Sequence, residues 1–182
     1  MNTVNRKKDI AVIGMSGIFP KSKNIPIFWE NLVNGKELVH FYEPEEINEK
    51  LLGIANYVPV GSFLENSDSF DYNFFGYTRE EALLMDPQIR IMHEQVYASL
   101  DNAGYAHQLN KNNIGLYLAA SDNFNWRLLE MFYGEGKVSK FLAQRLSNKE
   151  FISTLISYKL GFQGPSFFSD TACSGSLTSI CR

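Results

Sequence analysis

Short apolar runs alternate along the chain with segments of helical spacing, and this alternation predicts the fold class. Two runs, Asp9-Ile10-Ala11-Val12-Ile13-Gly14 and Ile114-Gly115-Leu116-Tyr117-Leu118-Ala119-Ala120-Ser121, have the nearly continuous apolar pattern of strands that are buried on both faces. A third run follows Gly164-Pro165 and centres on Phe167-Phe168. Strands at the start, middle and end, separated by helical runs, predict an α/β fold with a largely parallel sheet.

Capping and stop signals predict where the first helices begin and end. Pro26 suits the first turn of a short helix on which Phe28 and Leu32 share a face, and Asn34-Gly35 would end that helix. A capping box over residues 78–81 opens a second helical segment, which Asp86-Pro87 interrupts and restarts. The restarted helix ends at Gly104, and its apolar stripe consists of Ile89, Met92, Val96, Leu100 and Ala103.

Two more helices are predicted after the second strand. Ser121 or Asp122 can cap the first of them. Ser147-Asn148-Lys149-Glu150 can cap the second, which then runs toward Gly161.

The regions outside these elements are expected to have structural roles. Residues 39–69 have a weak pattern and are predicted to form a surface excursion, in which Pro44-Glu45-Glu46 can start one helical turn. Phe70-Asp71-Tyr72-Asn73-Phe74-Phe75-Gly76 is predicted to pack as an aromatic cluster. His93 lies one residue from the apolar stripe and has no partner at a spacing that would build a site, so we predict a structural role for it.

Cys173 is the candidate nucleophile. The run after Gly164-Pro165 leads through Asp170-Thr171 into small residues, and Leu177 and Ile180 then have helical spacing, which predicts a strand, a sharp turn and a helix. Unpaired amides at the start of that helix would favour a thiolate, and small neighbours leave room for a substrate. The alternative interpretation is a small buried apolar cysteine at the start of a core helix.

Several motifs together resemble a known family. Asp170-Thr171-Ala172-Cys173-Ser174-Gly175-Ser176-Leu177 resembles the active-site segment of β-ketoacyl synthases, above all the ketosynthase domains of modular polyketide synthases. The chain is similar to the same family from Ile10 onward in Gly14-Met15-Ser16-Gly17, Phe19-Pro20, Phe28-Trp29-Glu30-Asn31-Leu32, Met85-Asp86-Pro87-Gln88 and Leu100-Asp101-Asn102-Ala103-Gly104-Tyr105.

The resemblance implies a thiolase-like fold and an activity. It identifies residues 9–182, after a tail at 1–8, as the N-terminal portion of a 3-oxoacyl-[acyl-carrier-protein] synthase domain, an acyltransferase of polyketide or fatty-acid biosynthesis. Cys173 would accept an acyl chain from an acyl carrier protein for a decarboxylative Claisen condensation. Substrates would arrive on the phosphopantetheine of that carrier, so no further cofactor is expected, and the complete enzyme would be a homodimer.

Two departures from the family qualify this expectation. Many ketosynthases have serine at the position of Gly175, which we interpret as a tolerated variation near the nucleophile. The family also places two catalytic histidines beyond the cysteine, and none of His40, His93 and His107 matches their motifs. We therefore expect that this chain alone does not elongate an acyl chain and that a polypeptide carrying the C-terminal half is a partner. A split or truncated ketosynthase acting only as a docking module is the alternative, and an unrelated cysteine hydrolase is disfavoured because no base is in evidence.

Composition and charge exclude other classes. The chain has 182 residues, of which 45% are hydrophobic and 20% charged, as in a globular protein. With a net charge of -3 and no basic cluster, neither nucleic acid nor a membrane surface is an expected partner. Cys173 and Cys181 are the only cysteines, which provides neither a disulfide framework nor a paired-cysteine metal motif. We expect no metal and a cytoplasmic location.

Overall fold

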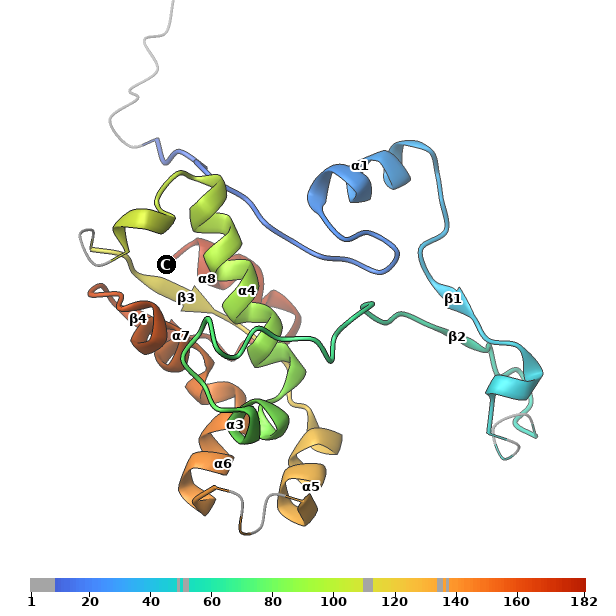
Figure 1. Ribbon diagram of the computed structural model, residues 1–182. Helices are drawn as coiled ribbons and strands as arrows, with labels where there is room; N and C mark the ends of the chain where they lie inside the picture. Colours follow the sequence, from blue (N-terminus) through green and yellow to red (C-terminus); the bar gives the residue numbers. More distant parts are fainter. Residues whose placement is uncertain (1–8, 49, 51–52, 110–112, 134–135, 137) are drawn as a thin grey trace, which may run out of the picture. The chain divides into compact units, whose positions relative to one another are not determined.

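Among the residues that the structure describes, the strands form two separate pairs. The computed structural model describes residues 9–48, 50, 53–109, 113–133, 136 and 138–182, and Figure 1 draws its helices and strands. These residues form two compact units, one made of residues 9–15 with Asp68–Arg182 and the other of Ser16–Ser67. The tail expected at residues 1–8 lies outside the described residues.

The smaller unit contains one helix and an antiparallel strand pair. Its elements are α1 (Ile25–Val33), β1 (His40–Phe41), the 3-10 turn η2 (Pro44–Glu46) and β2 (Val60–Gly61). The Asn24 side chain caps α1 by accepting from the Ile27 N–H at 3.0 Å, and Gly35 follows the helix with φ +61°. The structure thus confirms the short helix with its stop at Asn34-Gly35 and the helical turn at Pro44.

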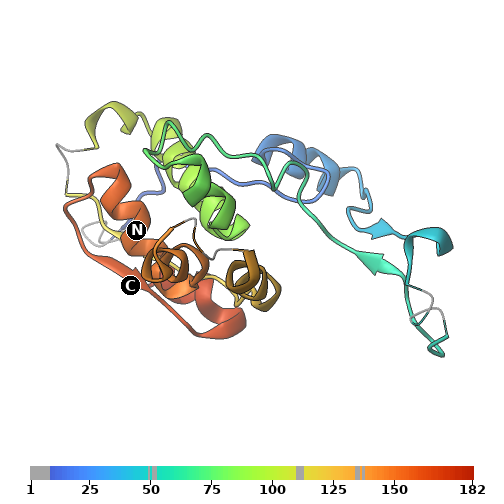
Figure 2. The same ribbon diagram turned by 60° about the horizontal axis from the view of Figure 1, so that its bottom comes forward.

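The larger unit carries the remaining elements in an α/β order. They are α3 (Arg79–Leu84), α4 (Pro87–Asn102), η3 (Ala106–Gln108), β3 (Leu116–Leu118), α5 (Phe124–Tyr133), α6 (Lys140–Ser147), η4 (Lys149–Phe151), α7 (Ile152–Leu160), β4 (Ser166–Phe168), η5 (Ala172–Ser174) and α8 (Gly175–Ile180). Both ribbon views show α5, α6 and α7 on the path of the chain from β3 to β4 (Figures 1 and 2). None of the helices among the described residues is both long and apolar enough to cross a membrane.

The sheet that positions the candidate site is the parallel pair of β3 and β4. Leu116 lies opposite Ser166, and Leu118 lies opposite Phe168. Helix α7 packs against both strands, α8 packs against β3, and α4 packs against α7. Because the two strands are parallel, the segments that follow them emerge at the same edge. The second and third predicted strands and their parallel arrangement are therefore confirmed.

The core of this unit lies between α4, α7 and the strand pair. Its fully or nearly fully buried apolar side chains include Met85, Ile89, Leu146, Ile152, Leu155 and Ile156. Phe75 is buried and stacks on Phe70 with ring centroids 5.3 Å apart, whereas Phe74 is 55% exposed. Phe74 nevertheless packs edge-on against the rings of Phe75 and Tyr97, with centroids 4.9 and 4.8 Å away, so the predicted aromatic cluster is confirmed as packing.

Local capping chemistry determines the helix ends of this unit. The predicted capping box at α3 is present, since the Thr78 hydroxyl accepts from the Glu81 N–H and the Glu81 carboxylate accepts from the Thr78 N–H. Asp86 caps α4, Gly104 follows it with φ +79°, and Gly161 ends α7 in the left-handed region.

Of the two predictions about the following helices, one is wrong and one is confirmed. The cap of α5 is neither Ser121 nor Asp122 but Asn123, whose side chain accepts from the Trp126 N–H at 3.2 Å. The predicted cap within residues 147–150 is confirmed, since the Asn148 side chain accepts from the Glu150 N–H at the start of η4, which passes directly into α7 and ends at Gly161. The preceding α6 was not predicted. Helix α6 has a Ser139 cap and a short buried face that includes Ala143 and Leu146. It lacks the long apolar stripe that marks a helix in sequence.

The first predicted strand is also wrong. Residues 9–14 form no strand, and Ile10, Val12 and Ile13 are 92%, 79% and 62% exposed. The segment is tied to α4 near its end, where the Met15 N–H donates to the Asn102 Oδ1 at 3.0 Å. An apolar run becomes a buried strand only if neighbouring strands accept its backbone hydrogen bonds, and the described strands pair only as β1–β2 and β3–β4.

Candidate active site around Cys173

Cys173 lies in a hollow at the carboxyl ends of β3 and β4. The hollow has a volume of about 520 Å³, and it is lined by Ala119, Ala120, Ser121, Asp122, Lys149, Ser169, Asp170, Ala172, Cys173, Gly175 and Ser176. The lining residues come from the segments after the two strands, from η4, and from the η5–α8 turn. In parallel α/β sheets, this edge is where ligands bind.

The turn that carries Cys173 is held in an unusual backbone conformation. Ala172 has φ +48°, which side chains with a Cβ rarely adopt, and it directly precedes the cysteine. Two hydrogen bonds to the Thr171 carbonyl close the turn, one from the Ser174 N–H at 3.2 Å and one from the Ser174 hydroxyl at 2.8 Å. Cys173 is exposed. The predicted strand, sharp turn and helix are confirmed, and the alternative of a buried packing cysteine is wrong.

Gly175 allows α8 to approach β3 closely. The residue is buried, and a Cβ built on it would lie 2.6 Å from the Ala119 Cβ. Contacts this short do not occur between real side chains, so any larger residue would push α8 away from the end of β3. The close approach of Ala119 thus favours glycine at position 175, which is a tighter constraint than the tolerated variation that we inferred from the sequence.

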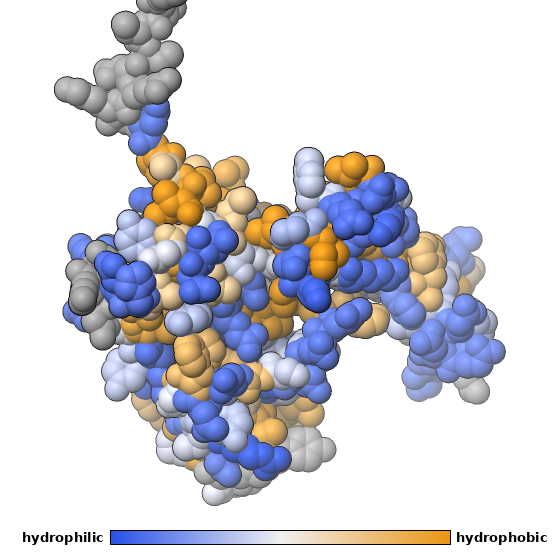
Figure 3. Space-filling model, turned by 45° about the horizontal axis from the view of Figure 1, so that its top comes forward, coloured by the Kyte–Doolittle hydropathy of each residue, from blue (hydrophilic) through white to orange (hydrophobic). Residues whose placement is uncertain are grey.

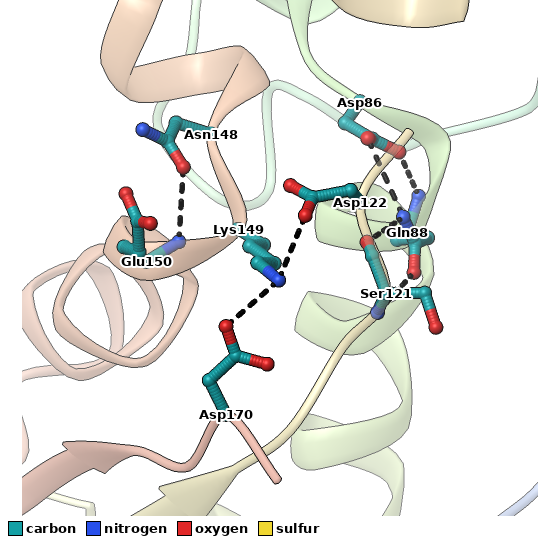
Figure 4. A network of polar contacts seen from close by, with 8 residues as sticks. All are labelled: Asp86, Gln88, Ser121, Asp122, Asn148, Lys149, Glu150 and Asp170. Atoms are coloured by element: carbon teal, nitrogen blue, oxygen red, sulfur yellow. Dashed lines mark hydrogen bonds and ion pairs between the residues drawn. The ribbon is translucent and has the colours of Figure 1, made fainter. Parts of the chain in front are cut away.

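An ion cluster joins three segments beside the cysteine. Figure 4 shows the Lys149 ammonium between the carboxylates of Asp122 and Asp170, with Nζ–Oδ2 distances of 3.0 Å to each. The Lys149 side chain is only 10% exposed, whereas those of Asp122 and Asp170 are 59% and 58% exposed. Hydrogen bonds to Asp122 and to Asp170 raise the pKa of Lys149, so the ammonium stays protonated at neutral pH.

A second polar network anchors the segment after β3 to the start of α4. The Gln88 side-chain amide donates to the Ser121 carbonyl at 3.0 Å and accepts from the Ser121 N–H at 3.3 Å. The buried Asp86 carboxylate accepts from the Gln88 N–H at 2.8 Å and from the Asn123 side chain at 3.3 Å. Burial raises the pKa of Asp86, and these hydrogen bonds oppose that shift. The segment that includes Ser121 and Asp122 is thus held to α4 through Gln88 and to η4 through Lys149.

None of the three histidines lines the hollow. His40 belongs to the smaller unit and His107 to η3. His93 is fully buried on α4, as expected of a structural residue. Its Nδ1 lies 2.7 Å from the Ile89 carbonyl, which can only accept, so Nδ1 carries the proton and Nε2 accepts from the Tyr77 hydroxyl at 3.1 Å. Desolvation lowers the pKa of His93 to about 4, so the ring is neutral.

The second cysteine, Cys181, lies just beyond the end of a helix. α8 ends at Ile180, and Cys181 is its exposed C-cap. Among the described residues, no three His, Cys, Asp or Glu side chains gather as metal ligands do.

Sequence reasoning singled out Cys173 as a candidate but did not identify the charged residues beside it. Lys149 was considered only as part of a helix cap, and Asp122 only as a cap of α5. No periodicity brings residues 122, 149 and 170 together. The available signal was that Asp122 and Asp170 each follow a predicted parallel strand, whose carboxyl ends meet at one edge.

The family model of the β-ketoacyl synthase N-terminal domain matches residues 7–181. Polyketide synthase PksN of Bacillus subtilis (strain 168) is 35% identical over 179 residues, covering 94% of this chain and 3% of that protein. Polyketide synthase ThaG of Burkholderia thailandensis is 30% identical over 192 residues, covering 95% of this chain and 3% of that protein. The chain therefore spans only a small part of these relatives.

Solved ketosynthase structures have the same fold. Ketosynthase twelve of the bacillaene polyketide synthase from Bacillus amyloliquefaciens matches with a TM-score of 0.81 and 35% identity, covering 93% of this chain and 30% of that one. The ketosynthase from module 1 of the bacillaene synthase of the same species matches with a TM-score of 0.78 and 35% identity, covering 92% and 30% of the two chains. The thiolase-like fold that the sequence predicted is thereby confirmed for the N-terminal portion of a ketosynthase.

Proposed function

The chain belongs to the β-ketoacyl synthase family, and from that premise we propose that Cys173 accepts an acyl chain as a thioester from an acyl carrier protein. The observation that carries this proposal is the placement of an exposed cysteine in a hollow at the carboxyl ends of two parallel strands, on a turn with a positive φ directly before it. Strained backbone of this kind occurs preferentially at functional sites.

The acyl transfer needs a nucleophile and donors for the oxyanion. The Cys173 thiol loses its proton, and the thiolate attacks the carbonyl carbon of the carrier-bound thioester. The tetrahedral intermediate then breaks its bond to the phosphopantetheine sulfur, which leaves as a thiolate and takes up a proton. The backbone N–H of Cys173 is the proposed donor to the developing oxyanion, and the loss of one such donor typically costs about 3–4 kcal/mol in the transition state.

The condensation step needs groups that the described lining of the hollow does not contain. In a decarboxylative Claisen condensation, a malonyl thioester loses carbon dioxide, and the resulting enolate attacks the acyl carbon and releases the Cys173 thiolate. The three histidines lie outside the hollow, so we propose that the remainder of a ketosynthase domain supplies the groups that stabilise the carboxylate and the enolate. This chain covers 30% of the solved ketosynthase chains. The proposed partners are an acyl carrier protein, a C-terminal ketosynthase half and a second copy of the complete domain, in the cytoplasm.

Self-acylation of the full chain tests the proposal. The protein would be incubated with an acyl thioester and analysed by intact-mass and peptide mass spectrometry. We expect one acyl group on Cys173, none after Cys173→Ala, and unchanged acylation after the matched change Cys181→Ala. Acylation of Cys181 at an equal rate would overturn the assignment. Carbon dioxide release from a malonyl carrier protein above the Cys173→Ala level would overturn the proposal that the condensing groups lie elsewhere.

A further inference from the structure

The charged residues of the Cys173 hollow form one cluster. Apart from Asp122, Lys149 and Asp170, the described lining consists of alanine, serine, glycine and the cysteine itself. Within the described part of the chain, these three side chains therefore carry all of the formal charge that lines the hollow. Two carboxylates and one ammonium give the cluster a net charge of -1 at neutral pH.

The three side chains differ in what they present to an incoming group. Lys149 is nearly enclosed, and its ammonium contacts both carboxylates at 3.0 Å, so it acts mainly within the cluster. More than half of each aspartate side chain stays exposed. A group that enters the hollow to reach the sulfur therefore meets carboxylate oxygens rather than the ammonium. The Lys149 ammonium also lies 6.0 Å from the centre of the Phe168 ring on β4, which further restricts where it can move.

We propose that the cluster of Asp122, Lys149 and Asp170 determines which acyl groups reach Cys173, by disfavouring those with a negative charge. Lys149 is the residue that keeps this repulsion small, because it neutralises one of the two carboxylates. The inference deepens the proposed acyl transfer and rests on it for its biological meaning. An uncharged acyl group would reach the sulfur faster than one that carries a carboxylate, which matches the separate roles of the acyl and the malonyl groups in a condensation.

Alkylation of Cys173 measures this charge effect without any acyl transfer. Iodoacetamide is neutral and iodoacetate carries one negative charge, and both form the same kind of carbon–sulfur bond with release of iodide. The ratio of the two rate constants at Cys173 reports the local potential, and the same ratio at the exposed Cys181 is an internal control. Failure of acyl transfer in the previous experiment would leave this measurement intact, so the two proposals can fail separately.

Three charge states of the cluster give a graded expectation. The net charge of the cluster is -1 in the unaltered chain, -2 in Lys149→Met and 0 in Asp122→Asn. At low ionic strength we expect the iodoacetate to iodoacetamide ratio at Cys173 to fall about twofold to threefold in Lys149→Met and to rise by a similar factor in Asp122→Asn. Both changes should shrink in high salt, since these carboxylates face solvent.

Matched variants separate the charge effect from a general disturbance. Lys149→Arg keeps the charge and should keep the unaltered ratio, and the triple change Lys149→Met, Asp122→Asn and Asp170→Asn should reach the level of a cluster without net charge. Lys140→Met removes the same charge at the start of α6, outside the hollow. This change should leave the ratio at Cys173 unchanged. If Lys149→Met does not fold, Asp122→Asn alone decides. An unchanged ratio at Cys173 in folded variants, or an equal change at Cys181, would overturn the proposal.

Discussion

His93 shows how burial, as the largest of several effects, can lower the pKa of one residue. The ring lies among Phe70, Phe75 and Tyr77, with both nitrogens hydrogen-bonded in the neutral form. Desolvation lowers its pKa from 6.5 to about 4, despite the hydrogen bond to the Ile89 carbonyl. Since the unfolded chain binds this proton more readily than the folded chain, the contribution of His93 to stability is complete above pH 6.5 and is lost as the pH falls toward 4.

We predict that His93 makes unfolding strongly pH-dependent in that window. A shift of this size corresponds to about 3 kcal/mol between neutral pH and the folded pKa. Chemical denaturation at several pH values would measure it, as the difference between the unaltered chain and His93→Gln, because carboxylates also titrate there. The exposed His107, changed to Gln, is the matched control and should keep the full pH dependence. Parallel curves for the unaltered chain and His93→Gln would contradict the prediction.

At the scale of elements, the position of α8 depends on one close approach to β3. Gly175 begins the helix, and its backbone φ of -55° is open to any residue, so conformation does not require a glycine. Alanine at a helix interior position is favoured over glycine by about 1 kcal/mol. The contact of 2.6 Å with the Ala119 Cβ opposes that gain. Overpacking in a close contact costs about 1–3 kcal/mol and displaces backbone, so the steric effect should win.

We therefore predict that Gly175→Ala lowers the free energy of unfolding by about 1–2 kcal/mol and slows acylation of Cys173, two residues away. Adding Ala119→Gly removes the opposing Cβ. This second change should restore most of the lost free energy of unfolding and most of the lost rate of acylation. Thermal unfolding and self-acylation would be measured on the single and double variants, with Ser179→Ala, on the same helix but outside the hollow, as the control. A double variant no better than Gly175→Ala would show that this contact does not hold α8.

At the scale of the whole molecule, several large apolar side chains face solvent. Ile10, Leu177 and Ile180 are 92%, 64% and 81% exposed. Figure 3 shows apolar (orange) surface close to the point where the described part of the chain begins. Exposed apolar patches favour association, at about 25 cal/mol per Å² of surface that becomes covered.

We predict that the chain self-associates and that changes on α8 reduce this. Leu177→Gln combined with Ile180→Gln should raise the soluble yield and the monomer fraction in sedimentation, with little effect on thermal unfolding, because both side chains already contact water. Ser176→Gln is the polar control on the same helix. A monomeric, cooperatively unfolding unaltered chain would contradict the prediction. Co-expression with a C-terminal ketosynthase half should also raise the soluble yield if that half covers α8.

Local signals in the sequence determined the elements that depend on local chemistry. The capping box at Thr78, the N-cap at Asp86 and the left-handed stops at Gly104 and Gly161 work through neighbours within a few residues, so pattern alone located them. The same holds for the turn at Cys173, because its small residues and the family motif lie in one continuous stretch.

Tertiary structure alone decided what each segment contacts. The apolar run at residues 9–14 has the pattern of a buried strand, yet it is exposed, because burial depends on partner strands and not on the run itself. α8 ends at Ile180, although residues 177–182 contain no glycine, asparagine or proline that would mark a helix end in sequence. Lys149 contacts Asp122 and Asp170 only because the carboxyl ends of parallel β3 and β4 lie at one edge and because η4, which follows α6, lies at the same edge. The contacts between residues 122, 149 and 170 follow no periodic pattern in the sequence. Only the tertiary structure therefore places these charged side chains beside the cysteine.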